Sequence, residues 1–244
     1  MTKPVYSERK YLEEMVSSII CMPNIFRIRM GDGKFIFSIL TKDQDTAEYF
    51  SVSAIYDTIC EIDQRIKYAF SEAISFDLPV TLEYNSFSKP DAAERIALYH
   101  AENIVFRIST LWDILAQLCN IIYQTGYEPE KIHYKKYFYD IAKKEKTLDI
   151  FKEVEDYLKQ EEDRVVNINN PWTGNHIFLS NYRNRMTHRL SPNVSSISQL
   201  GFTSRPPTMY ILHRAIEDYH MVSSFLCRLI NQYLEEHKNW MPLT

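Results

Sequence analysis

Glycine is scarce in this chain, at five of 244 residues, against seventeen tyrosines and thirteen phenylalanines. So few glycines argue against a Gly-rich phosphate-binding loop and against a β-sandwich with many tight turns. The composition favours helices instead, and 45% hydrophobic residues can build a sizeable core in one large domain or two small ones. The expected fold class is therefore mainly all-α, a helical bundle.

Closely spaced cysteines and long apolar segments are missing as well. The four cysteines lie tens of residues apart without metal-ligand spacing, which is typical of buried thiols in a reducing cytoplasm: Cys21, Cys60, Cys119 and Cys227. Lys10, Glu13 and Glu14 interrupt the N-terminal apolar pattern, unlike a signal peptide, and we find no later apolar run of about 18 residues. We therefore expect a cytoplasmic protein with no membrane partner and no metal.

Acidic residues are absent from Arg164 through Ile216, although the formal net charge of the whole chain is only -4. This window carries about +6 and the rest of the chain about -10. Its six basic residues are Arg164, Arg183, Arg185, Arg189, Arg205 and Arg214. We expect these arginines to form a cationic surface, which would suit a nucleic-acid backbone.

Hydrophobic periodicity divides the chain into helices and one hairpin. Before residue 90 it predicts a helix over 7–21, a β-hairpin over about 25–40 around Gly31-Asp32-Gly33, and one long or two broken helices over 46–75. After residue 90 it predicts helices over 91–124, near 147–162, over 171–190 and over 208–238, with a loop over 191–207. Asn170 and Pro171 have the form of an N-cap and a first helical residue. We assign 1–90 to an N-terminal segment and 91–244 to a helical bundle.

Two polar patterns have more than one interpretation. The segment "KIHYKKYFYDIAKKEK", which begins at Lys131, mixes lysines with aromatic rings and could stack on a polynucleotide. We favour an amphipathic surface stretch with half-buried rings and snorkelling lysines. Arg107 and Asp113 on the 91–124 helix are six residues apart and do not pair locally, so they could instead form a buried polar set that supports the 171–190 helix.

The most informative segment is "SNYRNRMTHRLSP", residues 180 to 192, at the end of the 171–190 helix. Asn184 and His188 are four residues apart and share one helix face. Arg183 and His188 are five apart, which separates their directions by roughly 140° on a regular helix. A single regular helix therefore does not aim both at one small ligand, so either the turn is irregular or a second copy of the chain completes the site.

This segment resembles the motif of HEPN domains, the "higher eukaryote and prokaryote nucleotide-binding" helical bundles. Arg183-Asn184-Arg185-Met186-Thr187-His188 has the R-N-x-x-x-H form of their Arg-x4–6-His motif, near the end of a helix that one more long helix follows. The earlier segment "HAENIVFRISTLWDILAQLCNIIY" is similar to the early helix of larger stand-alone HEPN proteins. The resemblance covers residues 91 to 244.

The resemblance implies a metal-independent endoribonuclease that works as a homodimer without a cofactor and leaves 2′,3′-cyclic phosphate and 5′-hydroxyl ends. The implied catalytic residues are Arg183, Asn184 and His188, and the implied RNA-binding residues are Arg185, Arg189, Arg205 and Arg214. Such enzymes are toxins or phage-defence effectors, with an antitoxin or a nucleotidyltransferase as partner. Leu190 stands where some of these toxins carry the tyrosine that the transferase modifies.

These residue types suit RNA cleavage without a metal. An imidazole with a pKa near neutrality can move the 2′-hydroxyl proton or protonate the leaving oxygen. A guanidinium supplies a permanent forked charge for the phosphorane as it gains negative character.

Other interpretations of the same residues stay open. The arginines and His188 also fit a solvated helix end, where each cation stabilises the helix dipole by about 0.3–1 kcal/mol. A non-catalytic HEPN-like module that binds RNA, a nucleotide or a protein would use the same helices only to dimerise. His213, Glu217 and His220 share one face of the last helix with a spacing known from metal sites, but no cysteine or third histidine completes it and Glu217 can pair within the helix.

Overall fold

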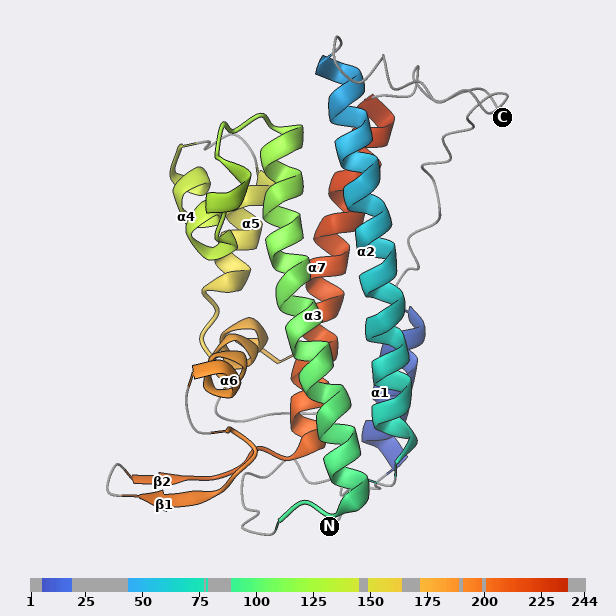
Figure 1. Ribbon diagram of the computed structural model, residues 1–244, viewed down its shortest axis with the longest axis vertical. Helices are drawn as coiled ribbons and strands as arrows, with labels where there is room; N and C mark the ends of the chain where they lie inside the picture. Colours follow the sequence, from blue (N-terminus) through green and yellow to red (C-terminus); the bar gives the residue numbers. More distant parts are fainter. Residues whose placement is uncertain are drawn as a thin grey trace.

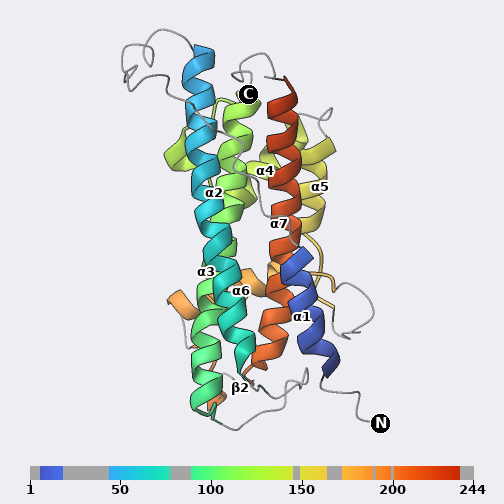
Figure 2. The same cartoon turned by 90° about the vertical axis from the view of Figure 1, so that its right-hand side faces the viewer.

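Three long helices run side by side along the molecule (Figure 1). They are α2 (Gln44–Ser75), α3 (Ala92–Ile122) and α7 (Thr208–Glu236), and α1 (Tyr6–Ser18) packs against α2 and α7 near one end (Figure 2). The structure is a computed structural model that describes residues 6–18, 44–76, 78, 89–144, 149–163, 172–188, 191–198 and 201–236. The mainly all-α class is confirmed, whereas the hairpin predicted over 25–40 lies outside the described residues.

Helix α3 is the central helix of the bundle. Its N-terminus is fixed by Asp91, whose carboxylate accepts a hydrogen bond from the backbone N–H of Glu94 at 2.8 Å. By length and composition α3 is the one described helix that could cross a membrane, contrary to our expectation that no such run exists. Its most apolar window is 61% buried inside the fold, as it would be in a core helix.

Helix α2 is one continuous helix, which decides between the two predictions for 46–75. Of the five positions that the apolar spacing predicts as buried, Ile59, Ile66 and Phe70 are buried, whereas Ile55 and Ile62 are only partly buried. Its polar Asp63 accepts a hydrogen bond from Tyr219 on α7 and forms an ion pair with Lys67 at 3.1 Å. One hydrophobic core cluster includes residues from Leu12 to Leu234.

Shorter helices cover the side of α3 that faces away from α2 (Figure 1). They are the 3-10 turn η2 (Pro129–Lys131), α4 (Tyr134–Lys144), α5 (Asp149–Leu158) and α6 (Asn175–His188). On α4 the rings of Tyr134, Tyr137 and Phe138 are buried while the lysines are exposed, which confirms the amphipathic interpretation. Tyr139 is the one aromatic residue of α4 that remains exposed.

The start of α6 differs from the prediction. The helix begins at Asn175 rather than at Pro171, because Gly174 has a left-handed φ of +70° that ends the preceding turn. The backbone N–H of Thr173 donates to the Asp163 carboxylate at 3.0 Å, and the Asn175 side chain donates to the Trp172 carbonyl at 2.7 Å. These contacts hold Trp172 and Thr173 in a turn before the helix.

The predicted loop between α6 and α7 contains a small hairpin. Its strands β1 (Ser196–Ser198) and β2 (Gly201–Thr203) are antiparallel and pair Ile197 with Phe202. The hairpin projects beyond the helices near the start of α7 (Figure 1). Strands of three residues are too short to show a hydrophobic period, so the sequence signal was absent.

Candidate functional site

The last turns of α6 carry the predicted motif. Helix α6 packs on α3, α5 and α7 and is a regular α-helix through His188. The helix is therefore regular from Arg183 to His188, which excludes an irregular turn between them. On the helix of one chain these two positions face directions that differ by roughly 140°.

The other motif residues differ in their exposure. Asn184 is exposed and Arg185 is partly exposed, so both are accessible from solvent. The Thr187 hydroxyl donates to the Arg183 carbonyl at 3.2 Å. The structure does not describe the side chain of His188. Arg164 and the predicted RNA-binding residue Arg189 also lie outside the described residues.

Arg183 is half-buried and turned toward the bundle. Its Nε atom is buried and has no hydrogen-bond partner among the described residues. It lines a recess of about 10 Å³ together with Trp112, His176 and Asp218. That volume is roughly enough for one water molecule, so the recess cannot hold a ligand, and the guanidinium has to meet any substrate from the solvent side.

A group of polar side chains surrounds Arg183, and we call Asp113, His133, Lys135, Ser180 and Arg183 the Arg183 cluster. Burial raises the pKa of Asp113, and the Tyr134 backbone N–H and the charges of Arg183 and His133 partly offset that rise. Lys135 donates to the Ser180 hydroxyl at 2.7 Å. Burial lowers the pKa of Lys135, the charge of Asp218 partly offsets this effect, and nearby Arg183 adds to it. The cluster therefore concentrates positive charge on the side where α3, α4 and α6 meet.

Only a part of this cluster was visible in the sequence. Asp113 is half-buried and lies close enough to Arg183 for their charges to interact, and its support of the motif helix stays a prediction. Arg107 does not join it, since its guanidinium donates to the carbonyl and side chain of Asn103 on the same helix. Lys135 was missed as a neighbour of the motif, because only the fold brings the start of α4 next to α6.

Beneath Arg183 a buried network connects five helices, and Asp218 on α7 is its centre. Trp112 Nε1 donates to the Asp218 carboxylate at 3.2 Å and the Tyr157 hydroxyl donates to it at 2.9 Å. His176 Nδ1 lies 3.3 Å from the same carboxylate, and its Nε2 lies 3.0 Å from the Tyr134 hydroxyl. With these partners α6 is fixed in rotation on α7, which sets the direction in which Arg183 points.

Arg205 and Arg214 correct the predicted cationic surface, because both are buried. The Arg205 guanidinium is 3% exposed and binds the Glu94 carboxylate on α3 at 2.5 Å. Arg214 is fully buried and donates to the Thr173 carbonyl at 2.5 Å, the Asn175 side chain at 3.0 Å and the Tyr210 hydroxyl at 2.8 Å. Their charges hold the fold together and are not available on the surface.

The three residues considered for a metal do not form a ligand set. Glu217 accepts hydrogen bonds from Tyr11, from the Trp172 N–H and from Asn175, and it lies 3.1 Å from His213 Nε2. Burial would raise the pKa of Glu217, but hydrogen bonds, from His213 above all, hold it below its usual value. His220 is exposed. Within the described ranges, no group of three His, Cys, Asp or Glu residues could hold a metal ion.

A groove of about 580 Å³ lies next to the C-terminal end of α6. One wall is the start of α3, with Arg95 and Tyr99, and the other is the turn from Ser191 to Ser195. Tyr99 is 63% exposed, which leaves its ring accessible for stacking on a ligand. Asn193 links the two walls, since its side chain donates to Glu102 at 2.6 Å and accepts from the Tyr182 hydroxyl at 2.6 Å.

The groove was not foreseen because its basic residues, Lys89 and Arg95, precede the arginine-rich window. Neither forms an ion pair with another described residue. A comparison with protein-family models found no match, and comparisons with curated proteins and with solved structures found no significant similarity. Any function has therefore to follow from the residues themselves.

Proposed function

We propose that this protein is a metal-independent endoribonuclease of the HEPN type, in which Arg183, Asn184 and His188 act at the end of α6. The observation that carries the proposal is the state of Arg183. Its side chain is half-buried, its Nε is buried without a described partner, and it lies five residues before His188. A guanidinium held in this way is ready for an anionic ligand such as an RNA phosphate.

In the proposed reaction the His188 imidazole accepts the proton of an RNA 2′-hydroxyl, and the oxygen attacks the adjacent phosphorus. The bond from phosphorus to the 5′-oxygen breaks, and a protonated imidazole returns a proton to the leaving oxygen. Cyclic 2′,3′-phosphate and 5′-hydroxyl ends result. Arg183 stabilises the extra negative charge of the phosphorane, and Asn184 orients the reacting groups.

The Arg183 cluster gives this chemistry its electrostatic setting. Lys135 supplies a second cation beside Arg183, so a phosphate there would meet two positive charges. Asp113 is half-buried and close enough to interact with Arg183, and we assign it the role of positioning the guanidinium. It is a positioning residue in this proposal and not a catalytic one.

The groove beside α6 is the proposed path of the RNA strand, in place of a surface that includes Arg205 and Arg214. Lys89 and Arg95 would contact backbone phosphates, and a base would stack on Tyr99. Because phosphate contacts release counterions, RNA affinity should fall steeply as salt concentration rises. A Tyr99→Ala change should weaken RNA binding even at low salt, since stacking does not depend on counterions.

The decisive experiment measures cleavage of single-stranded RNA by purified wild type, His188→Ala and Arg183→Ala, with EDTA present. Each substitution should lower the cleavage rate by roughly 10²-fold or more while leaving the fold intact. Arg228→Ala is the matched control, because Arg228 is an exposed arginine on α7 that pairs with Glu153 at 2.8 Å. Growth arrest on expression, relieved by the two motif substitutions, would support a toxin or defence effector that an antitoxin or nucleotidyltransferase controls.

Two results would overturn the proposal: the wild type leaves RNA uncut, or both motif variants cut as fast as the wild type. If the uncut RNA is nevertheless bound, the chain is a non-catalytic HEPN-like binding module. The retained Asp113 and Lys135 contacts of Arg183 would then serve RNA binding alone.

A further inference from the structure

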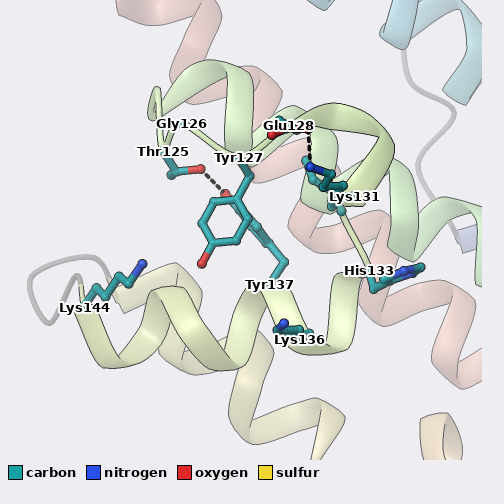
Figure 3. Close-up of a pocket in the computed structure, with 10 residues that line it drawn as sticks. Thr125, Gly126, Tyr127, Glu128, Lys131, His133, Lys136, Tyr137 and Lys144 are labelled. Carbon is teal, nitrogen blue, oxygen red and sulfur yellow. Dashed lines mark hydrogen bonds and ion pairs between the residues drawn. The ribbon is translucent and has the colours of Figure 1, made fainter.

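A second cavity lies between the end of α3, the turn η2 and helix α4 (Figure 3). Its volume is about 480 Å³, which falls within the range of small-molecule sites. Three lysines line it, namely Lys131, Lys136 and Lys144, together with His133. The one acidic residue of the lining is Glu128, which pairs with Lys131 at 2.7 Å.

Two of these lysines have no acidic partner among the described residues. Lys136 and Lys144 form no ion pair with another described residue, and both are exposed. Lys144 extends over the cavity toward Tyr127, with its Nζ 5.5 Å from the centre of the ring (Figure 3). A concave surface with uncompensated ammonium groups attracts anions, because its walls exclude part of the screening solvent.

The wall opposite these lysines is preformed. Asn120 on α3 holds the turn, since its side chain accepts from the Tyr127 N–H at 3.0 Å and from the Thr125 hydroxyl at 2.6 Å, and donates to the Tyr127 carbonyl at 3.0 Å. The Thr125 and Tyr137 hydroxyls lie 3.2 Å apart (Figure 3), and the Tyr127 and Tyr137 rings meet edge to face. A fixed wall lowers the entropy cost of binding, because little has to be ordered when a ligand arrives.

The spacing of the lysines indicates the size of the ligand. Lys136 and Lys144 are eight residues apart on one helix, which separates them by roughly 12 Å along the axis and about 80° around it. One phosphate group cannot contact both at full strength across that distance. We propose that this cavity binds a small molecule that carries two or more phosphate groups, held by Lys136 and Lys144 against the Tyr127 wall.

The cavity shares His133 with the Arg183 cluster, but its lysines are different from the lysine of the proposed ribonuclease site. Neighbouring lysines on α4 point elsewhere: Lys135 donates to Ser180 beside Arg183, and Lys143 lies over the Tyr139 ring at 3.7 Å from its centre. Because α4 carries lysines both inside and outside the cavity, two double variants can be compared that lose the same charge. Lys136→Gln with Lys144→Gln removes two charges from the cavity, and Lys135→Gln with Lys143→Gln removes two charges from the same helix outside it.

The test is calorimetric titration of the full chain with inorganic tripolyphosphate at low salt. The wild type should bind, the Lys136/Lys144 double variant should bind about tenfold or more weakly, and the Lys135/Lys143 double variant should bind like the wild type. Because both variants lose the same net charge, a non-specific charge effect would weaken both equally. Equal weakening, or no binding by the wild type, would overturn the proposal.

Two further arms separate this site from the RNA site. Arg183→Ala should retain tripolyphosphate binding whether or not it cuts RNA, so a failure of the ribonuclease proposal leaves this result unchanged. A single-stranded RNA without terminal phosphates should bind the Lys136/Lys144 double variant as well as the wild type. If that RNA instead displaces tripolyphosphate and loses affinity in the same variant, the cavity is a part of the RNA path, and a separate small-molecule site is excluded.

Discussion

The arginines of the stretch without acidic residues, residues 164–216, differ in how deeply they are buried in the fold. Arg205 and Arg214 are inside the fold, where Arg205 pairs with the Glu94 carboxylate and Arg214 donates to the Thr173 carbonyl, whereas Arg183 is only half-buried. A buried cation is tolerated when it is paired or hydrogen-bonded, so the partners of Arg205 and Arg214 make them structural groups. Linear charge density predicted a cationic region, but it cannot show which guanidinium groups meet oxygen atoms of the protein itself.

Arg214→Met should strongly destabilise the fold. The change leaves the carbonyls of Thr173 and Asp163 and the side chain of Asn175 without their donor, and each buried unsatisfied group costs about 1–3 kcal/mol. We expect the free energy of unfolding to fall by about 3 kcal/mol or more, measured by urea denaturation.

The control for this prediction is Arg228→Met on the same helix. Arg228 forms an exposed ion pair with Glu153, so its loss should cost less than about 1 kcal/mol. A near-neutral Arg214→Met would mean that the guanidinium is not held as described, and the buried role of this arginine would be wrong.

Among the helices, the turn before α6 decides where the motif helix begins. Gly174 has a φ of +70°, and a Cβ there would lie 2.4 Å from the backbone N and Cα of Glu162. The segment that follows α5 and the start of α6 therefore touch at a point that only glycine can occupy. This contact, with the Asp218 network, fixes the rotation and entry of the helix that carries Arg183.

Gly174→Ala should shift or destabilise α6, and Gly126→Ala is its matched control. Gly126 has a similar φ of +76°, but a Cβ there would have no atom within 4 Å, so alanine incurs only the left-handed backbone penalty of about 1–2 kcal/mol. Gly174→Ala adds a backbone clash, and its loss of unfolding free energy should be roughly twice as large or more. Thermal unfolding of both variants checks this, and equal losses would contradict the close approach.

Features with a local sequence pattern could be predicted, whereas features that depend on contacts between distant segments could not. The long helices were predictable because α2, α3 and α7 repeat their apolar residues over many turns. The start of α6 was not predictable, because the Asn170-Pro171 signal is local whereas the contact of Gly174 with Glu162 joins two separate segments. The Arg183 cluster joins α3, α4 and α6, and only Arg183 itself could be chosen from the chain as a catalytic residue.

For the molecule in solution, the regular geometry of α6 bears on oligomeric state. Arg183 and His188 point roughly 140° apart on one α-helix that continues through His188, so one chain does not aim both at a single phosphate. A two-fold dimer with α6 near its axis would bring Arg183 of one copy toward His188 of the other. The proposed ribonuclease site is then composite, which light scattering tests first by the molecular mass in solution.

Mixing two inactive variants tests the composite site directly. Arg183→Ala and His188→Ala homodimers should both be inactive, since every site lacks one of the two residues. In a heterodimer one site receives both substitutions and the other receives both native residues, so an equimolar exchanged mixture should recover about one quarter of wild-type RNA cleavage. If Arg183 and His188 of the same chain acted together, no heterodimer site would be intact and the mixture would stay inactive. A strict monomer at micromolar concentration that cuts RNA would equally exclude the composite arrangement.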